Sequence, residues 1–239
     1  MLWLILIFAI ICLYEFATVS ARTSSEKIYA LGGTLCIITL NSIGAVPGSL
    51  NMPLVVITSV FLIIGILHLI IQKGSILKHV PLIISSLLYI TLPFVVTILF
   101  LQHYENSNLI VLGTFIILWL NDAGAYFVGK AIGKRKLFRS ISPNKSWEGS
   151  IGGGVVGLLI CFAIAPIVGG TSLTHWLILS IIIWITGTYG DLFESAWKRS
   201  YSIKDSGNLM GGHGGFLDRL DSFIYAMPFV VLYYNLFLL

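Results

Sequence analysis

Acidic and basic side chains occur at helical spacing in the second half of the chain. Four polar residues recur at positions i, i+3, i+4 and i+7, which places them on one helical face: Asp191, Glu194, Ser195 and Lys198. Asp218 and Asp221 are three residues apart, so they face the same way if a helix begins there. Carboxylates without His or Cys partners suit a hard cation such as Mg²⁺, which usually also binds substrate phosphates.

A glycine-rich loop and further basic residues lie beside these carboxylates. The loop Gly211–Gly215 has His213 at its centre, and its backbone N–H groups can approach an anion closely. Basic residues beside a carboxylate cluster indicate phosphoryl or nucleotidyl transfer, because cations neutralise charge on the transferring phosphorus. Three roles are open for His213: a general base, a ligand, or only a hydrogen-bonding loop residue. A simpler interpretation of the charges is a set of interfacial salt bridges: Asp218 with Arg219, or Asp191 with Lys198.

The composition shows what kind of element must position these groups. Of the 239 residues, 57% are hydrophobic and only 10% are charged, whereas soluble domains carry about 25% charged residues. The mean hydropathy is +0.96. Such a chain cannot cover its surface with polar groups, so we expect an all-α, polytopic membrane protein. About eight segments are long and apolar enough to span a bilayer: Leu2–Ala21, Ile28–Val46, Pro53–Ile71, Val80–Leu101, Leu109–Val128, Ile151–Val168, Leu173–Phe193 and Phe223–Leu239.

The basic residues test this count of spans. All 14 Lys and Arg follow the first, third, fifth or seventh segment or lie at its end, and the other loops hold none. The positive-inside rule makes that face cytoplasmic and places both termini outside. We expect one transmembrane domain over residues 1–239. It divides into N-terminal helices (1–118), a motif-bearing catalytic region (119–222) and a last helix (223–239).

Two stretches before residue 150 add polar groups on the same face. Asp122 lies about two turns inside the basic loop, and an acid at that depth indicates either a functional role or a packing contact with a Lys or amide. The small residues 123–125 predict close helix approach. Ser142-Pro143 reads as a turn, and Lys145 with neighbouring hydroxyls can hold an anion. The basic run before it is interpreted as binding anionic lipid head groups: Lys134, Arg135, Lys136 and Arg139.

These stretches together resemble a known family. The pattern Ser195-x-x-Lys198-Arg199, Lys204-Asp205-x-Gly207 and His213-Gly214-Gly215-x-x-Asp218-Arg219-x-Asp221 resembles the signature of phosphatidate cytidylyltransferases, also called CDP-diacylglycerol synthases. Asp122-x-Gly124-Ala125-Tyr126 and Ser142-Pro143-x-Lys145 are also similar to that family. The resembling motifs cover roughly residues 119–222. The chain is short for the family, which predicts that a span near the N-terminus is missing.

The resemblance implies a reaction, its cofactors and its site. CTP and phosphatidic acid would give CDP-diacylglycerol and pyrophosphate, with Mg²⁺ and a second, monovalent cation (K⁺). Asp191 and Asp218 would hold Mg²⁺ with Asp221 assisting, and these three with Lys198 would be the catalytic residues. A homodimer in the bacterial cytoplasmic (inner) membrane, with membrane lipids and no nucleic acid as partners, is expected. The substrate-binding residues would be Asp122, Ser142, Lys145, Ser195, Arg199, Lys204, Asp205, His213, Gly214, Gly215 and Arg219.

Two other functions compete with this interpretation. A CTP-dependent lipid alcohol kinase, of the polyprenol or phytol type, would also join a nucleotide to a membrane lipid, but its acceptor hydroxyl attacks the γ-phosphorus. A transporter would need polar residues near the bilayer midplane and broken helices. Here the polar residues crowd at one interface, with Glu15 in the first segment as the exception that these interpretations do not explain.

Overall fold

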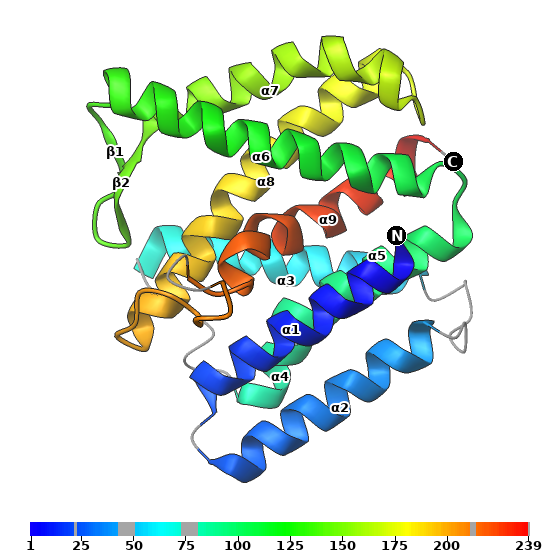
Figure 1. Ribbon diagram of the computed structural model, residues 1–239, viewed down its shortest axis with the longest axis vertical. Coiled ribbons are helices and arrows are strands. Elements are labelled where there is room, and N and C mark those ends of the chain that lie inside the picture. Colours follow the sequence, from blue (N-terminus) through cyan, green and yellow to red (C-terminus); the bar gives the residue numbers. More distant parts are fainter. Residues whose placement is uncertain (22, 43–50, 73–80, 211–213, 239) are drawn as a thin grey trace.

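The computed structural model describes the chain except residues 22, 43–50, 73–80, 211–213 and 239. The described chain is predominantly helical, with one short hairpin (Figure 1). The helices are α1 (Leu2–Ser20), α2 (Ser24–Ser42), α3 (Asn51–Gln72), α4 (Leu82–Ser86), α5 (Leu92–His103), α6 (Ser107–Ile132), α7 (Trp147–Val168), α8 (Leu173–Ser200) and α9 (Leu217–Phe237). A π-helical turn, η3 (Leu87–Thr91), joins α4 to α5, and strands β1 (Lys136–Phe138) and β2 (Ser142–Ser146) form the hairpin.

Each apolar segment expected from the sequence overlaps one or more of these helices. Among the described residues, five helical stretches are long and apolar enough to cross a membrane: Leu2–Ser20, Leu82–His103, Ser107–Ile132, Leu173–Ser200 and Leu217–Phe237. Two further helices are apolar over shorter stretches, Leu54–His68 and Trp147–Ala163. The chain is therefore a helical membrane protein, as its composition predicts.

The helix between residues 82 and 103 contains a local change of winding. Leu92 N–H donates to the carbonyl of Leu87 instead of the carbonyl four residues back. Pro93, in the first turn of α5, has no N–H and its ring crowds the carbonyl of the preceding turn. The wider π-helical turn before it absorbs this conflict without breaking the helix.

The segment between α6 and α7 differs from the sequence prediction. Ser142 and Pro143, expected to form a turn, lie in strand β2, and the turn is formed by residues 139–141. The strands are antiparallel, with Lys136 opposite Ser146. The Glu148 carboxylate accepts hydrogen bonds from the backbone N–H groups of Lys134 (3.1 Å) and Arg135 (3.1 Å). That contact joins the start of α7 to the chain that leaves α6.

Helices α6 and α7 run side by side (Figure 1) because glycines line their contact. A Cβ on Gly124 would lie 2.9 Å from the Val156 Cβ and 3.2 Å from the Gly153 Cα, so no larger residue fits between the backbones. The close approach predicted from the small residues 123–125 is confirmed. This contact fixes the hairpin relative to both helices.

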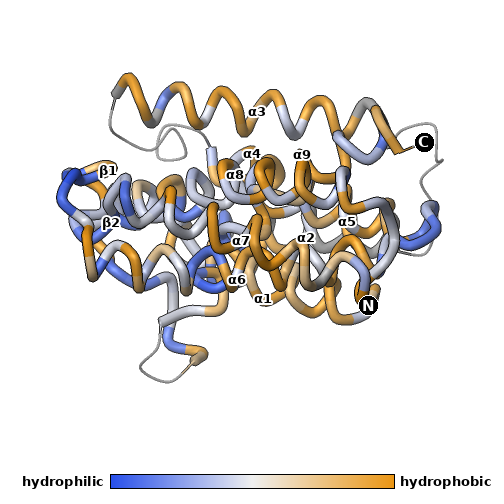
Figure 2. Tube along the Cα trace, turned by 90° about the horizontal axis from the view of Figure 1, so that it is seen from above, coloured by the Kyte–Doolittle hydropathy of each residue, from blue (hydrophilic) through white to orange (hydrophobic). Residues whose placement is uncertain are grey.

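Helix α9 lies at the centre of the bundle (Figure 1). Phe223 stacks on Phe115 of α6 with ring centroids 4.1 Å apart, and the Tyr225 hydroxyl donates to the Leu62 carbonyl of α3 at 2.5 Å. Helix α3 covers one face as an outer layer (Figure 2). Both views place the start of α1 and the end of α9 at the opposite end of the bundle from the hairpin.

Candidate functional site

A cavity of about 1020 Å³ opens between α6, α7, α8, α9 and the hairpin. Its lining includes apolar side chains such as Phe115, Trp119 and Trp184. It also includes Glu194 and the charged groups that the sequence predicted for the site: Asp122, Lys145, Asp191, Lys198, Asp218, Arg219 and Asp221. The cavity therefore presents apolar and charged walls to a single ligand space.

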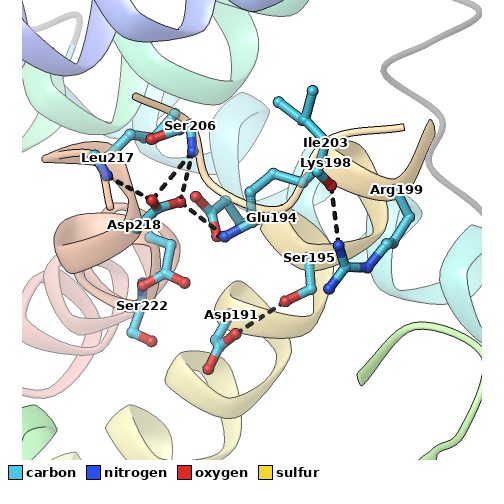
Figure 3. A network of polar contacts seen from close by, with 12 residues as sticks. Asp191, Glu194, Ser195, Lys198, Arg199, Ile203, Ser206, Leu217, Asp218 and Ser222 are labelled. Carbon is cyan, nitrogen blue, oxygen red and sulfur yellow. Dashed lines mark hydrogen bonds and ion pairs between the residues drawn. The ribbon is translucent and has the colours of Figure 1, made fainter. Parts of the chain in front are cut away.

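Lys198 connects the two helices that carry most of the charge. Its Nζ lies 2.6 Å from the Glu194 Oε2 on the same helix and 2.7 Å from the Asp218 Oδ1 on α9 (Figure 3). Glu194 is 1% exposed and Lys198 is 9% exposed, so water screens this triad little. The shared helical face predicted for α8 is confirmed, and Lys198 pairs with Asp218 and Glu194, not with Asp191 as the simpler interpretation supposed.

Asp218 is held in place by backbone groups as well as by Lys198. It accepts hydrogen bonds from the N–H of Ser206 (3.1 Å) and of Gly215 (2.7 Å). Gly214 has a φ of +89°, and a Cβ there would lie 2.7 Å from the Asp218 Oδ2, so both conformation and space require glycine. The loop N–H groups that the sequence assigned to an anion thus include one that binds a protein carboxylate. His213 lies outside the described residues.

Asp191 joins α8 to the hairpin. Lys145 of β2 forms an ion pair with the Asp191 carboxylate, and the Ser195 hydroxyl donates to it at 3.2 Å (Figure 3). Both side chains are partly exposed, at 28% for Lys145 and 32% for Asp191, so they are accessible from the cavity. Lys145 was predicted to contact phosphate, and its place on the cavity wall suits that role.

Asp221 and Asp122 add negative charge near this ion pair. Asp221 is 7% exposed, and its carboxylate accepts the N–H of Ser222 at 2.6 Å. Asp122 and Asp221 line the same cavity as Asp191 and Lys145. An excess of carboxylates over cations here suits a bound cation.

The described carboxylates fit Mg²⁺ only if substrate phosphates and water complete its coordination. Within the described parts of the chain, no group of three or more His, Cys, Asp or Glu side chains is arranged to hold a metal ion alone. Asp218 is occupied by Lys198 and two backbone N–H groups, whereas Asp221 accepts a single local hydrogen bond. Mg²⁺ commonly takes one or two carboxylates together with phosphates and water, and Asp191 and Asp221 both line the cavity as candidates for that role.

Several residues predicted for the site lie outside the cavity walls formed by the described chain. Arg199 turns toward the loop and donates to the Ile203 carbonyl at 3.0 Å (Figure 3). Lys204 and Asp205 are exposed in that loop, and Ser142 is half-buried in β2. Sequence reasoning placed Glu194 on the right face but gave it no role. Its spacing of four residues before Lys198 was the available signal.

This fold and site define a polytopic membrane protein whose cavity brings apolar walls and a cluster of carboxylates and lysines together. Comparison with known proteins then identifies the family. The model of the cytidylyltransferase family matches residues 1–237, and the chain belongs to that family. The family resemblance expected from the motifs is thereby confirmed.

Relatives of the chain carry a more specific name. It is 48% identical over 124 residues to the phosphatidate cytidylyltransferase of Bacillus subtilis, a match covering 51% of this chain and 46% of that protein. It is 42% identical over 154 residues to the phosphatidate cytidylyltransferase of Haemophilus influenzae, covering 60% and 54%. The matches span about half the length of these curated relatives.

Proposed function

We propose that the protein is a phosphatidate cytidylyltransferase, which converts CTP and phosphatidic acid into CDP-diacylglycerol and pyrophosphate. The observation that carries this proposal is a cavity in which Phe115 and Trp119 face the same space as Lys145, Asp191 and the Lys198 triad. A diacyl lipid phosphate needs both kinds of wall, because its tails are apolar and its head group is anionic. The names of the relatives support the same assignment.

The reaction places specific demands on the chain's own side chains. A phosphatidate oxygen attacks the α-phosphorus of CTP, and the bond to pyrophosphate breaks as the new P–O bond forms. Lys145 and Lys198 reduce the repulsion between the two polyanions and hold them in line. Phosphate is largely ionised at neutral pH, so the attack needs no strong base. Mg²⁺, held by Asp191 and Asp221 and assisted from Asp218, would neutralise charge on the phosphates, and K⁺ is proposed as the second cation.

The proposed setting is the bacterial cytoplasmic membrane, crossed eight times with both termini outside, in a homodimer. The arrangement of the helix ends supports this topology, because the hairpin lies at the opposite end from the start of α1 and the end of α9. The basic residues of the hairpin, including Lys136 and Arg139, then lie on the cytoplasmic side.

Thiol labelling tests this orientation. Ser140, exposed in the hairpin, and Asn106, exposed between α5 and α6, are replaced by Cys in separate variants. We expect a membrane-impermeant maleimide to label Asn106→Cys in intact cells and Ser140→Cys only after permeabilisation. Wild-type protein, whose own cysteines are Cys12, Cys36 and Cys161, gives the background, and Cys12 and Cys161 are buried. The reverse pattern would place the hairpin outside.

The activity is tested with purified protein, Mg²⁺, phosphatidic acid and CTP labelled at the α-phosphorus. We expect magnesium-dependent label in the lipid fraction and unlabelled pyrophosphate. Label that enters a lipid alcohol only from γ-labelled CTP would identify a lipid kinase instead. No transfer in either assay, from protein that unfolds cooperatively, would refute the enzyme assignment and favour transport.

The hairpin provides a comparison of two lysines. Lys145→Ala removes the cation paired with Asp191, so we expect kcat/KM for CTP to fall about 10- to 100-fold. Lys136→Ala, nine residues earlier and exposed in β1, is expected to change it by less than about twofold. Steady-state kinetics of both variants measure the difference. A complete loss in Lys136→Ala would contradict the assignment of that strand to lipid head groups.

A further inference from the structure

Glu15 is a buried carboxylate in an otherwise apolar helix, far in sequence from the motifs described above. It lies in α1 and is 3% exposed. A buried carboxylate is stable only where donors or cations satisfy its oxygens. Its donors in the described chain all come from the segment 206–217, which carries the signature of the site.

Three hydrogen bonds connect Glu15 to that segment. Its Oε1 accepts the backbone N–H of Phe216 at 3.0 Å. Its Oε2 accepts the backbone N–H of Leu217 at 2.8 Å and the Ser206 hydroxyl at 3.0 Å. An ionised carboxylate only accepts hydrogen bonds, so three donors around two oxygens form a consistent set.

Two of these donors belong to the N-terminus of α9. The first N–H groups of a helix have no partner within the helix and need a cap. Phe216 stands at the N-cap position, and its side chain makes no cap hydrogen bond. Glu15 therefore caps α9 from another helix, and its negative charge is favourable beside the positive end of the helix dipole.

Glycines make room for this carboxylate. A Cβ on Gly207 would lie 2.6 Å from the Glu15 Oε1, and a Cβ on Gly215 would lie 2.6 Å from the Oε2. Gly207 and Gly215 both belong to the signature. Gly207 does not line the cavity, and the space that Glu15 occupies explains why this position is a glycine.

Ser206 binds both Glu15 and the site residue Asp218. Its hydroxyl donates to Glu15, while its backbone N–H donates to Asp218 at 3.1 Å. Gly215, packed against Glu15, donates its own N–H to Asp218 at 2.7 Å. Asp218 in turn binds Lys198 at 2.7 Å. The same short segment is thus held by Glu15 on one side and by Asp218 on the other.

We propose that Glu15 is a positioning residue: it caps α9 and holds residues 206–207 and 215–217 so that Asp218 and Lys198 face the cavity in a fixed arrangement. This inference rests on the proposed function for its kinetic consequence, but its structural consequence is measurable without activity. Glu15 itself does not line the described cavity.

Glu15→Gln tests the proposal with almost unchanged size. The amide replaces one acceptor oxygen with an N–H₂ group, which faces donors and loses at least one hydrogen bond. We expect amide hydrogen exchange at Phe216 and Leu217 to accelerate at least about tenfold, with no change in peptides from α6 and α7. We also expect the Mg²⁺ concentration for half-maximal activity to rise about tenfold.

Three other variants make the result specific. Ser206→Ala removes one donor and should shift both readouts in the same direction by less, and the Glu15→Gln/Ser206→Ala double variant should be non-additive. Glu15→Asp retains the charge on a shorter side chain and should recover part of the Mg²⁺ response. Tyr14→Phe, one residue away and exposed, is the matched control on α1 and should change neither readout.

The outcomes separate the two proposals. Unchanged exchange at Phe216 and Leu217 in Glu15→Gln would overturn the inference, whether or not the wild type transfers cytidylyl groups. Faster exchange with an unchanged Mg²⁺ response would reduce Glu15 to a purely structural cap and also overturn it. An inactive wild type with faster exchange in the variant would refute the proposed function and leave the positioning of the segment supported. If Glu15→Gln does not fold, Glu15→Asp and Ser206→Ala decide by the same two readouts.

Discussion

Asp221→Asn is expected to reduce turnover by at least about 10²-fold while the protein still inserts and folds. The Asp221 carboxylate accepts a local hydrogen bond from Ser222 N–H, which an amide oxygen can also accept, so the change removes charge with little disturbance of packing. Asp221 lines the same cavity as Asp191 and Lys145, where the proposed magnesium and the triphosphate of CTP would meet. The α-labelled CTP assay measures the loss, and thermal unfolding checks the fold.

A matched change elsewhere controls for this result. Glu105→Gln removes a carboxylate from the exposed connection between α5 and α6, and activity should stay within about twofold of wild type. Asp221→Asn with more than half of wild-type turnover would exclude Asp221 from the metal site. The proposed pair of carboxylates would then have to be sought between Asp191 and Asp218.

Lys198→Met is expected to have the largest effect on stability. The substitution retains the apolar stem but leaves Glu194, which is 1% exposed, next to Asp218 without its cation. Removing one partner of a buried ion pair destabilises by about 3–5 kcal/mol. Chemical denaturation in detergent measures the stability, and activity should be lost together with it.

A second substitution separates the two roles of Lys198. The Lys198 Nζ lies 2.6 Å from the buried Glu194 Oε2, so the stabilisation of this carboxylate depends on the ion pair with Lys198. Glu194→Gln added to Lys198→Met should restore much of the stability, because no uncompensated charge then remains on Glu194. Activity should stay lost, since the phosphate-facing cation is still absent. Recovery of activity in the double variant would show that Lys198 only stabilises the fold.

Local sequence spacing predicted the parts of the site that a single helix controls. Asp191 and Ser195 are four residues apart, and they do form a hydrogen bond on one face of α8. The helix expected to begin near Asp218 begins at Leu217, so Asp218 stands in its first turn. These features follow from helical periodicity, which fixes side-chain directions without knowledge of the neighbours.

The spacing of residues in the sequence could not predict the contacts between different helices and strands. Lys145 with Asp191 and Lys198 with Asp218 depend on which helices pack together, and equally plausible pairings existed for both carboxylates. The local preference of Ser142-Pro143 predicts a turn, but pairing with β1 in the hairpin holds these residues in an extended strand. Glu15 had no visible partner because its donors lie 191 to 202 residues further along the chain.

The distance in sequence between Glu15 and its donors also determines how long Glu15 waits for them during synthesis of the chain. Helix α1 enters the membrane early with its carboxylate, and a charged side chain costs about 2.5–3.5 kcal/mol at the centre of an inserting helix and less near its end. The hydroxyl and N–H groups that satisfy Glu15 are added 191 to 202 residues later, roughly 10–40 s at ordinary rates of translation. Until α9 arrives, Glu15 must rely on water or transient partners near the interface. A chain interrupted before α9 therefore keeps in its first helix an acid without the N–H groups of Phe216 and Leu217.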